Sequence, residues 1–259
     1  VGANLMDIGM VAMQKEFDQL ERFVDNFQQI NMKIRTSKIP IVVSTQGYVF
    51  GGGCEIAMHC DGGIYASESY IGLVEVGVGL LPGGGGTKEF ALRASDDFFE
   101  GDVQSPTLIN YFKSIATAAV STSAYEAFDL NYLKKGRDEV CINTNLNIGL
   151  AKEKVLELAK NYIPPSARDD IQVLGRAGMG VLYSAINEFR MGEYMSDYDV
   201  EIARKIAYVL CGGDLTSSQQ VSEQYLLDIE REAFVSLAGE SLTQDRIKHM
   251  LKKGKPLRN

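Results

Sequence analysis

The sequence predicts an α/β fold, because two stretches between residues 39 and 95 each run from a strand or loop through a glycine cluster into a helix start. Apolar residues recur at steps of three and four in several other segments, which is the spacing of amphipathic helices. No internal repeat interrupts this organisation. We therefore expect a glycine-rich core of strands and helices, with further helices around it.

Composition limits the class of protein and its partners. With 259 residues, 45% of them apolar, the chain can bury one large core, or one core with a helical appendage. A net charge of −8 argues against nucleic acid and anionic membranes as partners. Without a signal peptide or an apolar run of about 20 residues, we expect a cytoplasmic protein that does not insert into membranes. The cysteines lack Cys-x-x-Cys spacing, which predicts reduced thiols: Cys54, Cys60, Cys141 and Cys211.

One amphipathic helix is predicted before the glycine clusters, closing near Lys38. Polar residues such as Lys15 and Glu16 fall between its apolar positions. Its methionines suit either a flexible substrate wall or a packed core, and core packing is the commoner role. The apolar positions are Met6, Met10, Met13, Phe17, Leu20, Val24, Phe27 and Ile34.

The first glycine cluster predicts a strand, a tight turn and a helix that begins beside a carboxylate. The short β-branched run Ile41–Ser44 suits a buried strand, and Gly51–Gly53 permit positive φ angles and close backbone approach. A helix through Ile56 would leave its first N–H groups free to hold an anion or a developing oxyanion. Glu55 falls in the first turn of that helix, beside these donors.

The second cluster has the same design. Pro82 fixes the approach of the chain, Gly83–Gly86 form a tight loop, and Thr87 is expected to cap the following helix. Glu75 lies upstream. Two carboxylates with two donor loops suit acid and base chemistry beside a polarised carbonyl group.

Other interpretations of these residues fit less well. A nucleotide-binding loop ends in Gly-Lys-Ser/Thr, but the order Gly86-Thr87-Lys88 misplaces the lysine, and no Gly-x-Gly-x-x-Gly opens a helix at either cluster. His59 lies four residues after Glu55, but without a His-Glu-x-x-His motif it is expected to be a packed helix residue, and no metal site is predicted. Taken alone, a pair of glutamates more often complements helix termini or pairs with lysines.

Helices dominate the prediction after the second cluster. Ser123 followed by Glu126 indicates a capping box, and Pro164-Pro165 ends a further helix. Gly212-Gly213 separates two later ones. In chain order, the helical segments are residues 108–115, a short helix after Ser123, residues 145–163, 200–210, 226–237 and 247–251.

Several motifs together resemble the crotonase superfamily, specifically enoyl-CoA hydratase. Gly51–Asp61, Glu75 and Leu81–Thr87 are similar to that family's signature. Val1–Leu5 is similar to an earlier donor motif of the family, in which Asp is commoner than the Asn4 found here. Residues 243–259 are similar to the C-terminus of bacterial multifunctional proteins that carry a 3-hydroxyacyl-CoA dehydrogenase followed by an enoyl-CoA hydratase.

The resemblance implies a crotonase (ClpP/crotonase) ββα superhelix core, N-terminally truncated, with a C-terminal helical region. The expected boundaries are 1–148 for the core, lacking its first strands, and 149–259 for the helical region. In the family a β-α-β portion precedes the donor motif, so we expect Ile41 and Val43 to lack some neighbours. A strand over residues 139–143 should close the core.

The resemblance also implies the chemistry. Glu55 and Glu75 would flank the β-carbon of a 2-enoyl-CoA thioester and add water, with Gly83 helping to hold that water. Val1 and Gly52 would form the oxyanion hole. Ala3, Gly51 and Gly53 would contact substrate.

The implied partners and cofactors follow from the same resemblance. The partner is an acyl-CoA thioester, together with further copies of the chain or a covalent upstream dehydrogenase domain. The hydratase needs no cofactor, and NAD would serve only that upstream domain. Four tail lysines could meet CoA phosphates, although solvated charge is their commoner role: Lys248, Lys252, Lys253 and Lys255.

Two alternatives to hydration stay open. Enoyl-CoA isomerase, in the same superfamily, can act with one carboxylate, and the presence of both Glu55 and Glu75 favours hydration. A binding or assembly module without turnover is the other alternative, because the chain starts at Val1, on the donor motif itself.

Overall fold

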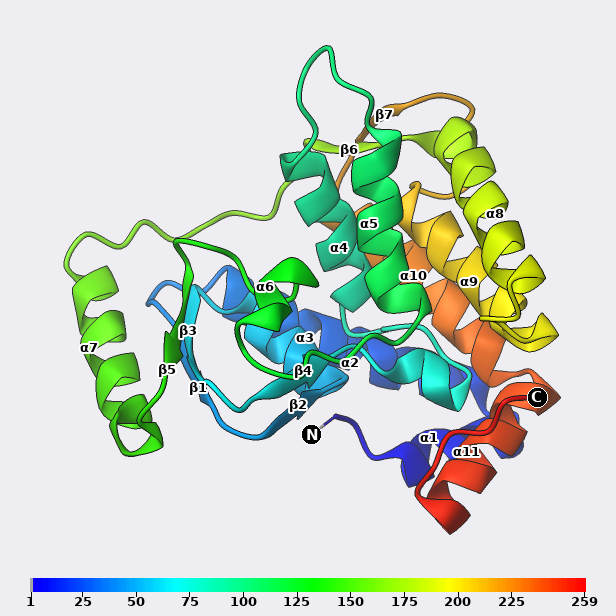
Figure 1. Cartoon of the computed structure of the whole chain (residues 1–259), viewed down its shortest axis with the longest axis horizontal. Coiled ribbons are helices and arrows are strands. Elements are labelled where there is room, and N and C mark those ends of the chain that lie inside the picture. Colours follow the sequence, from blue (N-terminus) through cyan, green and yellow to red (C-terminus); the bar gives the residue numbers. More distant parts are fainter. Residues whose placement is uncertain (1) are drawn as a thin grey trace.

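A computed structural model describes residues 2–259 (Figure 1). Two small parallel sheets and their helices lie at one side of the molecule, and a group of long helices lies at the other. The elements in chain order are α1 Leu5–Met13, α2 Phe17–Arg35, β1 Val42–Thr45, β2 Tyr48–Phe50, α3 Gly52–His59, β3 Gly62–Ala66, β4 Tyr70–Gly72, the 3₁₀ helix η1 Glu75–Val78, α4 Gly86–Asp96, α5 Ser105–Ala116, α6 Glu126–Asp129, β5 Asp138–Cys141, the 3₁₀ helix η2 Thr144–Leu146, α7 Asn147–Ala159, β6 Ile171–Val173, α8 Gly175–Met191, α9 Asp197–Leu210, β7 Gln219–Val221, α10 Glu223–Ala238 and α11 Ser241–Lys253.

The strands repeat a ββα unit, which confirms the predicted core. β1, β2 and α3 form one unit, and β3, β4 and α4 form the next. Successive units stack in parallel: β1 pairs with β3, β3 pairs with β5, and β2 pairs with β4 in a separate sheet. Val42 lies opposite Gly62, and Tyr48 lies opposite Tyr70. This stacking brings the two glycine clusters, which follow β2 and β4, to the same side of the sheets.

β1 lies at an edge of its sheet. Ile41 and Val43, which we expected to lack neighbours, are both only partly buried. α7 packs against β1 and β3, and Ile64, Cys141 and Ala151 form a small apolar cluster there. Figure 1 shows α7 at the far side of this sheet from the helical group.

The main apolar core joins the glycine-cluster helices to the C-terminal helices. α4 and α5 pack against α9, α10 packs against α2 and α4, and α11 packs against α1. One continuous set of buried apolar side chains, including Phe90, Phe112 and Ile206, runs through these elements. The division of the chain at residue 148 stays a prediction. Within residues 2–259, no helix has the length and apolar character needed to cross a membrane.

The structure corrects two expectations at the N-terminus. The single helix predicted up to Lys38 is two helices, because Lys15 adopts a left-handed φ of 59° between them. The turn lets α1 pack on α11 while α2 runs beside α3 and α10. Apolar periodicity continues through Lys15, so the pattern alone does not show the break.

The predicted caps also differ. Thr87 does not cap α4: the N-cap is Gly85, with φ 99°, and the Thr87 hydroxyl donates to the Pro82 carbonyl. At α6, Glu126 N–H donates to Ser123 Oγ at 3.3 Å, but the Glu126 carboxylate accepts from Thr122 instead of completing the box on Ser123.

The later predicted elements are present, although some begin or end at other residues than expected. The closing strand is β5, two residues shorter at its C-terminal end than expected, and the helix before the proline pair is α7. The helices predicted over residues 200–210, 226–237 and 247–251 correspond to α9, α10 and α11. The prediction missed β2, β3, β4, β6, β7 and α8.

Candidate active site

The first glycine cluster places Glu55 in the first turn of α3. Gly51 follows β2 with φ 54° and ψ −127°, a conformation that a side chain would strain. A Cβ at Gly51 would also lie 3.0 Å from Glu75 Oε1. The turn directs α3 inward, so that Glu55 is only 2% exposed.

Glu55 joins the two glycine clusters. Its Oε1 accepts hydrogen bonds from Gly84 N–H at 2.7 Å and from Gly86 N–H at 2.9 Å. Side chains on this loop would collide with what surrounds it: a Cβ at Gly84 would lie 2.2 Å from Phe27 Cε1, and one at Gly86 would lie 2.8 Å from Glu55 Oε1. The loop is therefore glycine-rich because a carboxylate and an aromatic ring pack directly on its backbone.

Glu75 begins η1, on the same cavity as Glu55. Its Oε2 is shielded from solvent and has no hydrogen-bond partner within residues 2–259. Burial, and then the neighbouring charge of Glu55, raise the pKa of Glu75 well above its ordinary value. Both causes favour the protonated form of Glu75.

Glu55 is shifted less, because its surroundings partly stabilise the ionised form. Burial raises its pKa to about 7, while the N–H groups of Gly86 and Gly84 and the charge of Lys88 oppose the rise. Two carboxyl groups with unequal proton affinities thus face one cavity. Such a pair suits one base and one acid.

The cavity has a volume of about 470 Å³, within the range of ligand-binding pockets. Apart from Glu55 and Glu75, the side chains around it are apolar. It therefore suits an uncharged, hydrocarbon-rich group held beside two carboxyls. The apolar lining side chains include Leu5, Ile8, Phe23, Val24, Phe27, Phe50, Val74, Val78, Leu80, Val120, Phe234, Met250 and Pro256.

The structure brings most of the predicted site residues together. Glu55, Glu75, Gly83, Gly51, Gly52 and Ala3 all line this cavity. Gly53 lies inside α3 and is not among the lining residues. Val1, the predicted first oxyanion donor, lies outside the described residues. The segment after it does reach Gly52, since a Cβ at Gly2 would lie 2.9 Å from Gly52 N.

Several lining residues were missed as site residues. Val24 and Phe27 were predicted only as apolar positions of a helix, and Phe234 only as part of a helical segment. Their periodicity marked them as inward-facing, but nothing in it distinguishes a cavity wall from a packed core. The methionine prediction was wrong: Met6, Met10 and Met13 are 54%, 48% and 43% exposed, and none lines the cavity.

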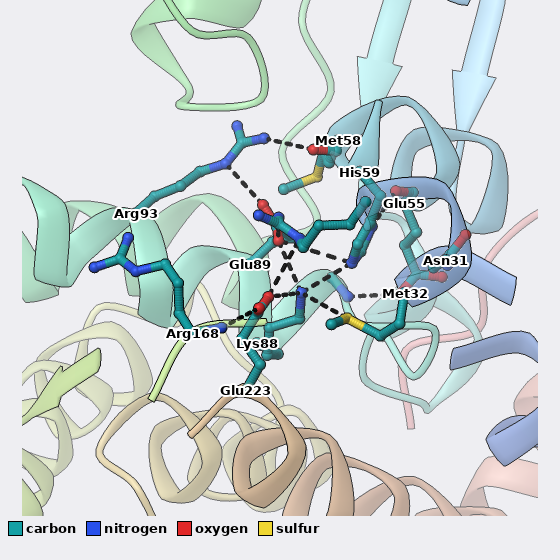
Figure 2. A network of polar contacts seen from close by, with 12 residues as sticks. Asn31, Met32, Glu55, Met58, His59, Lys88, Glu89, Arg93, Arg168 and Glu223 are labelled. Atoms are coloured by element: carbon teal, nitrogen blue, oxygen red, sulfur yellow. Dashed lines mark hydrogen bonds and ion pairs between the residues drawn. The ribbon is translucent and has the colours of Figure 1, made fainter. Parts of the chain in front are cut away.

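His59 and Lys88, which had suggested a metal or a phosphate loop, belong to a buried polar network behind the loop. Figure 2 shows the Lys88 amino group among His59, Glu89 and Glu223, with Nζ to Nε2, Oε1 and Oε1 distances of 2.9, 2.8 and 2.9 Å. Residues 2–259 contain no cluster of three side chains arranged to hold a metal ion. His59 is buried on α3, with Nδ1 2.7 Å from the Glu55 carbonyl oxygen, so it is a packed helix histidine, as predicted.

Two further sequence predictions concern thiols and the tail. All four cysteines are free and buried, which confirms that they are not paired in disulfides. The tail lysines Lys248, Lys252, Lys253 and Lys255 are all exposed. Solvated charge is therefore the simpler account of these lysines.

Comparisons with known proteins agree with this fold. Residues 3–97 match the family model described as enoyl-CoA hydratase/isomerase. Over all 259 residues the chain is 39% identical to a Bacillus subtilis protein named "Probable 3-hydroxyacyl-CoA dehydrogenase", of which it covers 32%. It is 43% identical over 61 residues to "Crotonyl-CoA hydratase" of Syntrophomonas wolfei, which is 24% of each chain.

Solved structures show the same fold. An enoyl-CoA hydratase from Rhodobacter sphaeroides matches with a TM-score of 0.64 and 18% identity, over 100% of this chain and 74% of that one. An enoyl-CoA hydratase from Bacillus halodurans matches with a TM-score of 0.58 and 16% identity, over 95% and 75%. The chain spans about a third of the length of the curated multidomain relatives.

Proposed function

We propose that this chain, a member of the enoyl-CoA hydratase/isomerase family through residues 3–97, adds water across the double bond of 2-enoyl-CoA thioesters. The observation that carries the proposal is the pair Glu55 and Glu75: two shielded carboxyls of unequal pKa on one apolar cavity. Hydration needs a base for water and an acid for carbon, and the pair supplies both.

Glu55 is the base in this scheme. Its Oε1 is held by Gly84 and Gly86, and its Oε2 accepts no hydrogen bond from the described chain, which leaves Oε2 for a water molecule. Gly83 N–H likewise donates to no acceptor within residues 2–259, although neighbouring loop groups are bonded. Water held between Glu55 Oε2 and Gly83 N–H loses a proton to Glu55 as its oxygen bonds to the β-carbon.

Glu75 is the acid. Because burial and the neighbouring Glu55 favour its protonated form, it can deliver its proton to the α-carbon as the double bond is consumed. One proton leaves water for Glu55 and one leaves Glu75 for carbon, so the product gains H and OH. Exchange with solvent then restores both carboxyls.

The thioester oxygen gathers negative charge during the addition, and backbone donors would stabilise it. Gly52 N–H, at the start of α3, is the donor that we assign within the described residues. Val1 N–H is the second donor implied by the family motif. Ala3 and Gly51, which line the cavity, are assigned to substrate contact on the same grounds, whereas Gly53 does not line it and is left out.

The test is loss of the enoyl absorbance of crotonyl-CoA on adding this chain. We expect turnover by the wild-type chain and none above background with the Glu55→Gln, Glu75→Gln double variant. Turnover by the wild-type chain would also exclude a binding module without activity. A wild-type chain that is folded and saturable with substrate, yet inactive, would refute hydration.

We further propose that the chain acts in fatty-acid β-oxidation, in the cytoplasm, as part of a longer protein. The 39% identity to a protein named as a 3-hydroxyacyl-CoA dehydrogenase supports this, because such an enzyme would consume the hydration product. NAD would then be bound by that separate domain. NADH formation from 2-enoyl-CoA by the longer protein, with none when Glu75 is replaced, tests the coupling. Assembly with further copies of the chain is measured by light scattering.

A further inference from the structure

Glu230, on α10, bonds the Gly83–Gly86 loop at Gly85, between the two N–H groups that Glu55 holds. Its side chain is fully buried and does not line the cavity. Its Oε1 accepts from Gly85 N–H at 2.6 Å, and its Oε2 accepts from Lys88 N–H at 2.8 Å. The start of α4 is therefore bonded to a carboxylate from a segment far along the chain.

Two amides of α2 bond the carbonyl groups of the same loop. Gln28 Nε2 donates to Gly83 O at 3.0 Å and also to Glu230 Oε1 at 3.1 Å. Asn31 Nδ2 donates to Gly84 O at 2.6 Å. Both side chains are fully buried.

These contacts and those of Glu55 alternate along the loop. Glu55 holds the N–H groups of Gly84 and Gly86, and Glu230 holds the N–H group of Gly85 between them. The loop cannot shift toward either side without breaking a charge-assisted hydrogen bond. Gly83 N–H, the group assigned to water, is left free by this arrangement.

We propose that Glu230 is a positioning residue for hydration: by holding Gly85 and Lys88 N–H from behind, it fixes Gly83 N–H and the Glu55 carboxylate in the geometry that water attack needs. The inference rests on the proposed function. It assigns a role in catalysis to a helix beyond the family match, which covers residues 3–97.

The bonding pattern at Glu230 specifies a carboxylate. All three of its contacts are N–H donors, so both of its oxygens must accept. Burial and the charge of Glu55 raise the pKa of Glu230, while the N–H groups of Lys88, Gly85 and Gln28 stabilise its ionised form. A glutamine there would turn an NH₂ group toward one of the two backbone N–H groups. One donor would be left unpaired in a buried place, and the loop would have to move.

The chain offers a matched control in Glu223. It lies on the same helix and is also fully buried, but it bonds Lys88 Nζ and Arg168 N–H, at 2.9 Å each, and not the loop. Glu230→Gln and Glu223→Gln are compared by kcat and KM for 2-enoyl-CoA hydration and by melting temperature. Glu230→Asp, which keeps the charge, is the second variant if Glu230→Gln does not fold.

We expect Glu230→Gln to lower kcat about 10²-fold with KM unchanged, the loss typical of a small misplacement of reacting groups. Glu230→Asp is expected to retain more activity than Glu230→Gln. Glu223→Gln should lower the melting temperature while leaving the kcat of the folded protein unchanged. Wild-type kcat in folded Glu230→Gln, or equal kcat losses in Glu223→Gln, would overturn the inference and leave the proposed function standing.

A second measurement does not depend on turnover. Hydrogen exchange of the peptide segment containing residues 83–88 should accelerate in Glu230→Gln and stay near wild type in Glu223→Gln. If the wild-type chain hydrates no enoyl thioester, the proposed function fails, but the exchange comparison still decides whether Glu230 holds the loop. Unchanged exchange in Glu230→Gln would show that it does not.

Discussion

Replacing Glu55 by glutamine should make the protein more stable while removing hydration. Glutamine keeps the size of the side chain, and its carbonyl oxygen can still accept from Gly84 and Gly86 N–H. What it removes is the ionisable group. Because Glu55 is buried and its pKa is raised from 4.5 to about 7, ionising it works against the folded state.

The size and sign follow from that pKa. Below about pH 4.5 Glu55 is protonated in both the folded and unfolded states, so its contribution to stability is fully present. As pH rises toward about 7 the unfolded state ionises first, and that contribution is lost. At about 1.4 kcal/mol per tenfold change in proton affinity, the loss above pH 7 is about 3 kcal/mol.

The assay is urea unfolding of wild type and Glu55→Gln at about pH 4.5 and about pH 8, together with crotonyl-CoA hydration at the higher pH. We expect equal stabilities at the lower pH, a variant more stable by about 3 kcal/mol at the higher pH, and a hydration rate reduced about 10²- to 10⁴-fold. Glu68→Gln, at an exposed position, is the control and should change neither quantity. A stability difference that does not grow with pH would refute the assigned environment of Glu55.

Three further predictions test the site. Glu75→Gln should abolish hydration and any isomerisation of 3-enoyl-CoA, whereas Glu55→Gln should reduce hydration more than isomerisation; equal, small losses from both would contradict the roles. In the wild-type chain, kcat should fall about tenfold per pH unit below pH 7, since protonated Glu55 cannot act as base, and a flat profile down to about pH 5 would argue against it. Gly84→Ala should lower the free energy of unfolding by about 1 to 3 kcal/mol and reduce the hydration rate, because the new Cβ would lie 2.2 Å from Phe27 Cε1. Gly149→Ala, with open space around it, is the control, and chemical denaturation compares the two variants.

Glu55 and the two glycine clusters could be predicted from the sequence, because the residues of each cluster lie close together along the chain. Gly51 precedes Glu55 by one helical turn, and Gly83 follows Pro82 directly. The need for glycine beside a carboxylate is visible in such short segments. Stacking of ββα units then makes it possible to infer that the two clusters meet.

The contacts of Glu230 and Gln28 with the Gly83–Gly86 loop could not be predicted in this way. Glu230 lies 145 residues from Gly85, and Gln28 lies 55 residues from Gly83. Both occur in helices whose apolar periodicity says which face is buried and nothing about which loop that face meets. A glutamate or glutamine on such an apolar face indicates a buried polar contact. It does not indicate which residue makes that contact.

The buried network in Figure 2 joins the first turn of α10 to α4, the helix that follows the loop. Lys88 follows the loop by two residues, and its amino group bonds Glu223 in the first turn of α10. Burying these charges adds little net stability, because the cost of desolvation offsets their attraction. The same burial is the largest cause that lowers the pKa of Lys88, to about 7. Removing one partner costs more: Glu223→Gln would leave the buried Lys88 charge without this carboxylate, a loss of about 3 to 5 kcal/mol. We expect that loss to appear as a lower melting temperature, because α10 also packs against α2 and α4 and so still brings Glu230 to the loop that holds Glu55.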